Sequence, residues 1–84
     1  MIITSITNWE VEKDDDRVIL VEPGDYVELS LQNCNLKMKG YADNIKPDYI
    51  FIKEHRGVNS RVFKVKQSRI TDIQMIRKKR HYNL

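Results

Sequence analysis

A strict alternation of apolar and polar side chains over residues 26–32 places the tightest limit on how this chain folds. The two sets are Val27, Leu29 and Leu31 on one side, and Tyr26, Glu28, Ser30 and Gln32 on the other. Side chains along a β-strand point alternately to its two faces, so this pattern is typical of a strand with one buried face. The preceding Pro23-Gly24 favours a turn from which the strand starts.

The residues that follow predict the other strands of one small β-structure. A polar loop at residues 33–35 suits a hairpin, because asparagine tolerates the left-handed backbone conformation that such loops need. A tight turn is expected at residues 67–69. By their runs of apolar and alternating residues, further strands are expected at residues 36–43, 49–53, 61–66 and about 71–77. A short helix is the alternative to the last of these strands.

Gly40 falls in the middle of the strand expected after the 33–35 loop, which is the second strand of the structure. A glycine inside a strand costs stability unless the backbone bends there or another segment approaches closely. Strong bending of a long second strand is what closes a small barrel. We therefore expect residues 24–76 to form a small all-β barrel, with Phe63 and Val65 facing its interior.

Residues 2–21 predict a β-hairpin that precedes the barrel. Residues 2–11 are rich in β-branched and aromatic side chains and are expected to form one strand. Residues 12–16 are mostly acidic and suit a turn. Residues 18–21 are continuously apolar, which favours a strand covered on both faces.

The length of 84 residues is enough for one domain. The single cysteine, Cys34, excludes an internal disulfide and favours a reducing compartment. The first residues do not place a basic residue before an apolar run, and no apolar stretch is long enough to cross a bilayer. We therefore expect a cytoplasmic protein without a membrane segment.

Charge is distributed unevenly along the chain. Residues 1–28 hold eight acidic and two basic side chains, a net charge of −6, and residues 29–84 hold thirteen basic and four acidic ones, a net charge of +9. Residues 77–84 form a basic tail. Such asymmetry indicates either an anionic partner for the basic part or neutralisation by the acidic part of the same chain.

The spacing of several residues resembles the pattern of the Sm-like barrel family. The matching features are Gly24, the polar loop at 33–35, Gly40, Asp48, the variable loop at 54–60 and Ile70-Thr71-Asp72-Ile73. Lys39-Gly40-Tyr41 and Phe63-Lys64 look similar to positions in the bacterial Sm-like RNA chaperone. The pattern is also similar to that of the small bacterial inhibitor of the Rho termination factor. The resemblance implies an Sm-like or SH3-like barrel of five to seven strands, here with an added N-terminal hairpin.

The basic residues after residue 28 are the strongest indication of function. Lysine and arginine contact phosphates and supply most non-specific affinity for nucleic acid, and exposed tyrosines can stack on unpaired bases. RNA or single-stranded nucleic acid suits a small barrel better than a duplex, which usually receives a helix. The candidate binding residues are Lys37, Lys39, Tyr41, Arg56, Arg61, Lys64, Lys66, Arg69, Arg77, Lys78, Lys79 and Arg80, and Tyr49 is a second stacking candidate.

Catalytic and metal chemistry find little support in the sequence. Cys34, His55 and His81 lack the short spacing of a zinc site, and residues 14–16 lack the glycine and distal glutamate of a calcium loop. Cys34 has no neighbouring base that would activate a thiol. The three glycines are far apart and form no phosphate loop. We expect a non-catalytic protein without metal or cofactor.

The competing prediction is a protein-interaction or homo-oligomeric assembly module. Small barrels expose edge strands that pair with other chains, and residues 2–6 and 61–66 are the expected edges. The acidic N-terminal part of one copy would then meet the basic C-terminal part of another. Trp9 is either an interface anchor or, by general burial trends, a core residue.

Overall fold

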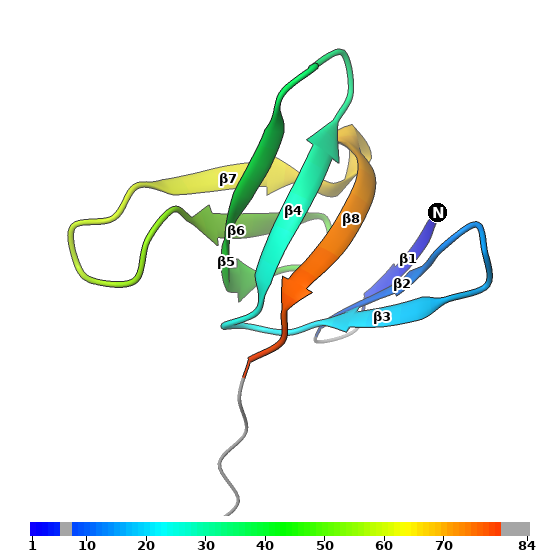
Figure 1. Cartoon of the computed structure of the whole chain (residues 1–84), viewed down its shortest axis with the longest axis horizontal. Coiled ribbons are helices and arrows are strands. Elements are labelled where there is room, and N and C mark those ends of the chain that lie inside the picture. Colours follow the sequence, from blue (N-terminus) through cyan, green and yellow to red (C-terminus); the bar gives the residue numbers. More distant parts are fainter. Residues whose placement is uncertain (6–7, 80–84) are drawn as a thin grey trace, which may run out of the picture.

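Two antiparallel β-sheets make up the computed structural model, which describes residues 1–5 and 8–79 (Figure 1). The first sheet has the order β1-β2-β3 and the second the order β7-β6-β5-β4-β8. A short 3-10 helix, η1 (Gln67–Arg69), precedes the last strand. The strands are β1 (Ile2–Ser5), β2 (Trp9–Glu12), β3 (Val18–Val21), β4 (Tyr26–Leu31), β5 (Lys37–Ile45), β6 (Tyr49–Lys53), β7 (Val62–Lys66) and β8 (Ile70–Arg77).

The five-stranded sheet curls into a small, partly open barrel. Figure 1 shows β6 and β7 crossing the direction of β4 and β8, with the long strand β5 shared between the two layers. The last strand, β8, lies beside the first strand of the unit, β4, so β7 and β8 are the sheet edges. The all-β prediction is confirmed, as are the turn at residues 67–69 and the final strand.

Alternation in β4 gives the buried face that the sequence predicts. Val27 and Leu29 have no solvent-exposed surface, while Tyr26 and Glu28 are half-buried on the other face. The 33–35 loop is a hairpin in which Asn33 has a φ of 57°, the left-handed conformation expected of an asparagine there.

Gly40 lies where Ile52 and Lys53 of β6 leave no room for a side chain on β5. A Cβ atom at this position would come within 2.8 Å of the Lys53 carbonyl oxygen and would also clash with the Ile52 side chain. The β5–β6 register shifts between Ala42 and Asn44, just after the glycine. The predicted reason for a glycine inside this strand, a bend with a close approach, is confirmed.

The N-terminal region is a three-stranded sheet and not the two-stranded hairpin that the sequence predicts. Residues 2–11 do not form one strand, because β1 ends at Ser5 and β2 begins at Trp9, and the two pair with each other. The prediction that β3 is covered on both faces is also wrong, since Val18 and Leu20 are 57% and 45% exposed. Burial alternates along β3: Val18 and Leu20 share the face in contact with solvent, while Ile19 is half-buried and Val21 is buried on the other face.

One core joins the two sheets. Trp9 is fully buried, and its indole N–H donates to the carbonyl oxygen of Lys46 at 2.7 Å, which settles its role as a core residue. Phe63, predicted to face inward, is 39% exposed on the edge strand β7. The buried apolar residues are Trp9, Val11, Val21, Val27, Leu29, Ala42, Ile45, Ile50, Ile52, Val65, Ile70 and Ile73.

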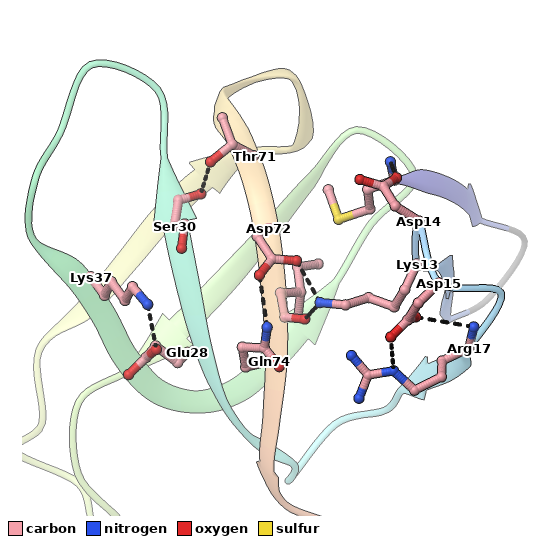
Figure 2. A network of polar contacts seen from close by, with 12 residues as sticks. Lys13, Asp14, Asp15, Arg17, Glu28, Ser30, Lys37, Thr71, Asp72 and Gln74 are labelled. Atoms are coloured by element: carbon pink, nitrogen blue, oxygen red, sulfur yellow. Dashed lines mark hydrogen bonds and ion pairs between the residues drawn. The ribbon is translucent and has the colours of Figure 1, made fainter.

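A lysine from the acidic turn fastens the first sheet to β8 (Figure 2). Lys13, whose side chain is 9% exposed, pairs with Asp72 and donates to the Ile73 carbonyl oxygen at 2.5 Å. Burial alone raises the pKa of Asp72, but hydrogen bonds from Lys13 and Gln74 and the Lys13 charge outweigh it. The pKa of this carboxyl therefore lies below its usual value of 3.8.

Candidate nucleic-acid interface

Two tyrosines meet on the outer face of the barrel. The β4–β5 register sets Tyr26 directly opposite Tyr41, and the ring centroids are 4.7 Å apart at an interplanar angle of 58°. Both side chains are half-buried, so each ring is anchored against the sheet while part of it stays open to solvent. Cross-strand aromatic pairs of this kind stabilise a sheet and also offer a rigid flat surface.

Two guanidinium groups flank the tyrosine pair. The Arg56 Cζ lies 5.0 Å from the centroid of Tyr41, and the Arg77 Cζ lies 5.5 Å from that of Tyr26. Arg77 Nη2 also donates to the Tyr41 hydroxyl at 2.9 Å. Arginine is attracted to aromatic faces and keeps its charge and donors available to phosphate in this arrangement.

A shallow hollow of about 420 Å³ opens beside Tyr41. Its lining includes Gly24, Tyr41, Lys53, Arg56 and Lys79, and we call it the Tyr41 hollow. Asp43 and His55 also reach it. A neighbouring hollow of about 340 Å³ runs to Tyr26 and Arg77 and shares the Tyr41, His55 and Arg56 walls. Positive charge around the two hollows thus comes from β6, the end of β8 and the 54–60 loop, and the carboxylates of Asp43 and Glu54 also line them.

Lys78 and Lys79, both predicted to bind, are held by a buried carboxylate. Asp25 has no exposed surface and accepts hydrogen bonds from the backbone N–H of Lys79 at 2.7 Å and of Glu22 at 2.8 Å. The Lys78 ammonium lies 2.8 Å from both Asp25 and Glu22. Burial lowers the pKa of Lys78, but these two carboxylates outweigh it and raise that pKa above 10.5. Lys78 therefore fixes the end of β8, while the Lys79 side chain still lines the hollow.

Lys37 and Lys39 share one acidic partner. They project from β5 and each lies 3.5 Å from a carboxylate oxygen of Glu28 on β4. The two lysine side chains stay more than half exposed, at 59% and 57%. This part of the sheet face therefore carries a net charge of about +1 from three charged groups.

Lys64 and Lys66 belong to a second aromatic site on the same sheet. The Lys64 ammonium lies 4.2 Å from the centroid of Tyr49, and Tyr49 meets Phe51 edge-on with centroids 5.4 Å apart. A hollow of about 400 Å³ lies there, and its lining includes Tyr49, Lys64, Lys66 and the acidic Asp48.

The remaining predicted residues lie apart from these two sites. Arg61 is exposed after the 54–60 loop, and Arg69 is exposed in η1. Neither lines the hollows around Tyr41 and Tyr49. Arg80 lies outside the described residues.

Sequence reasoning missed Tyr26, Lys53 and His55 as site residues. The alternation in β4 does place Tyr26 outward, and the short 33–35 loop sets the register that brings it to Tyr41. Lys53 lies opposite Tyr41 in the β5–β6 register. That pairing depends on the register shift between Ala42 and Asn44, and no local sequence pattern predicts this shift.

Two carboxylates of the acidic turn form ion pairs with cationic groups close to them. Asp14 pairs with the Met1 ammonium at 2.7 Å, and Asp15 pairs with Arg17 at 2.6 Å. Among residues 1–5 and 8–79, no three His, Cys, Asp or Glu side chains gather in a way that suits a metal ion. Within the same residues no helix has the length and apolar character to cross a membrane.

Comparison of the chain with protein-family models, curated proteins and solved structures finds no match.

Proposed function

We propose that this protein is a non-catalytic cytoplasmic binding protein that takes up RNA or single-stranded nucleic acid at the Tyr41 hollow. The carrying observation is the Tyr26–Tyr41 pair flanked by Arg56 and Arg77. Stacking on an aromatic ring and contact of phosphates with arginine are the two interactions on which single-strand binding depends. The proposal extends to an Sm-like relationship, which the bent strand at Gly40 and the partly open barrel support.

A base enters the site by stacking on Tyr41, and the Arg56 side chain moves to admit it. Arg56 is exposed and belongs to the 54–60 loop, so it can swing aside and close over the base as a second planar surface. Lys53 and Lys79 lie around the same hollow and face the phosphates on either side of that base. A duplex presents no free base face to such a site, which favours a single strand.

Titration of a labelled single-stranded RNA of about 12 nucleotides at about 50 and about 200 mM salt tests the proposal. We expect binding that weakens as salt rises and that falls roughly 5- to 100-fold in Tyr41→Ala, because stacking contributes about 1–3 kcal/mol per base. Tyr41→Phe keeps the ring and is the matched control. Absence of binding at the lower salt concentration, or equal binding by Tyr41→Ala, contradicts the proposal.

Edge-strand assembly is the second candidate, and exposed side chains on β7 favour it. Val62 and Phe63 are 47% and 39% exposed on an edge strand that pairs only with β6 among the described strands. The positions of β1 and β7 at sheet edges agree with the sequence prediction for residues 2–6 and 61–66. Light scattering distinguishes this candidate, because a self-associating protein has a mass that is a multiple of 10.0 kDa and that falls in Val62→Lys.

A further inference from the structure

The outer face of β6 connects the Tyr41 hollow to the second aromatic site. Burial alternates along β6, so Ile50 and Ile52 face the core while the intervening residues face outward. Lys53 lies opposite Tyr41 at one end of the strand, and Tyr49 lies at the other end. At about 3.3 Å per residue, the two ends of this row are about 13 Å apart.

Positive charge accompanies this row along its whole length. In the β6–β7 register Lys64 lies opposite Phe51, and Lys66 lies opposite Tyr49. The outward positions of the two strands are Tyr49, Phe51, Lys53, Val62, Lys64 and Lys66. None of these six is acidic, in contrast to the outer face of β4, where Glu28 pairs with Lys37 and Lys39 of β5.

Tyr49 has the two properties of a second stacking platform. Its edge-on contact with Phe51, at 5.4 Å between centroids, fixes the ring, and the Lys64 ammonium already lies over that ring at 4.2 Å. A flexible, exposed lysine moves aside more easily than a packed side chain, so a base can replace it on the ring face. The displaced ammonium then remains close to the phosphate of the same nucleotide.

We infer that the ligand is an extended single strand that runs along the outer face of β6 and places separate bases on Tyr41 and Tyr49. The inference rests on the proposed function at the Tyr41 hollow and adds the second base site and the path between them. Lys53, Lys64 and Lys66 contact the backbone between and beside the two stacked bases. A strand of about four nucleotides, the lower limit of site sizes on comparable small barrels, is then the shortest full ligand.

A length series of single-stranded RNA tests the path. We expect the affinity of the unmodified protein to rise roughly 5- to 100-fold between about two and about four to six nucleotides, as the second base reaches Tyr49. In Tyr49→Ala this gain is lost, while the affinity for the shortest oligonucleotide is unchanged. Tyr49→Phe keeps the gain, because the ring and not the hydroxyl forms the platform.

The outcomes separate this inference from the proposed function. If Tyr49→Ala binds the longer strands as tightly as the unmodified protein, the path along β6 is wrong and the Tyr41 site stands. If no strand of any length binds at low salt, both are wrong. If a urea titration shows that Tyr49→Ala does not fold, the double variant Lys64→Gln/Lys66→Gln replaces it. If affinity then depends on RNA length as it does in the unmodified protein, the path along β6 is wrong.

Discussion

Asp25 has no exposed surface, and its Oδ2 lies 2.8 Å from the Lys78 ammonium. The two residues are 53 positions apart in the sequence and join the turn before β4 to the end of β8. Two backbone N–H groups, of Glu22 and Lys79, complete the hydrogen bonding of the same carboxylate. Because Lys79 lines the Tyr41 hollow and Arg77 lines the neighbouring one, this buried carboxylate also sets the geometry of the candidate site.

Replacing Asp25 with alanine is expected to destabilise the fold by about 2–4 kcal/mol. The change leaves the backbone N–H groups of Glu22 and Lys79 without their acceptor in a partly buried position, and it removes one of the two carboxylates that pair with Lys78. Urea unfolding followed by circular dichroism measures the effect. Asp43→Ala removes a carboxylate from an exposed position and is the control, with an expected change within about 0.5 kcal/mol. Similar losses in the two variants would contradict the role given to Asp25.

Stability is expected to fall in acid through Asp72. Because its folded-state pKa lies below the unfolded value of 3.8, the ionised carboxylate stabilises the fold above about pH 4. That contribution is lost as the pH falls from 3.8 towards the lower folded-state value. Asp72→Asn should therefore flatten the pH dependence of the free energy of unfolding between about pH 2 and 5.

The control for this titration is Asp15→Asn. The pKa of Asp15 is also lowered: any burial acts to raise it, but hydrogen bonds from Arg17 and the Arg17 charge outweigh this. Solvent screens this exposed pair, so we expect a smaller change in pH dependence than in Asp72→Asn. A larger change in Asp15→Asn would show that the acidic turn and not the Lys13–Asp72 pair controls acid stability.

Gly40→Ala is expected to cost about 1–3 kcal/mol or more, since the added methyl group meets the Lys53 carbonyl and the Ile52 side chain. Gly57→Ala provides a comparison with the same chemical change. Gly57 has open space around it but a φ of +119°, so its cost is conformational only and is expected to be about 1–2 kcal/mol. Thermal unfolding of the two variants measures both, and a loss below about 1 kcal/mol for Gly40→Ala would mean that β6 does not approach β5 closely there.

Arg56→Gln is expected to weaken RNA binding and to reduce the slope of log K against log salt by about 0.7, the value for one lost phosphate contact on a single strand. Arg69→Gln makes the same change of charge at an exposed position in η1 that lines neither hollow. Its slope should stay that of the unmodified protein. An equal effect in both variants would mean that binding follows net charge and not the Tyr41 hollow.

The sequence predicts strands well where one face is buried and the pattern alternates. β4 is the best case, because Val27 and Leu29 are fully buried as its alternation requires. β3 is the opposite case: its continuous apolar run suits a strand covered on both faces, yet its residues form a sheet edge with Val18 and Leu20 exposed. Hydrophobicity alone cannot distinguish these situations, because it does not specify which strand lies next to which.

The candidate site depends on contacts that no local pattern specifies. Tyr41 and Arg56 are predictable as exposed aromatic and basic residues, but Tyr26 joins them only through the register of the β4–β5 hairpin. Asp25 is predictable as a turn residue, whereas its partners come from the end of β8. The ion pair between Lys78 and Asp25 is likewise a contact that the charge of Lys78 alone does not predict.

Lys79 lines the Tyr41 hollow while its backbone N–H donates to Asp25, so the Lys79 side chain starts from the rim of that depression. A label attached to the Lys79 side chain therefore begins close to Tyr41 and competes with a ligand for the hollow. A label at Met1 instead disturbs the ammonium that pairs with Asp14, on the edge of the other sheet. A comparison of RNA affinity between proteins labelled at the two positions is therefore itself a test of the Tyr41 hollow.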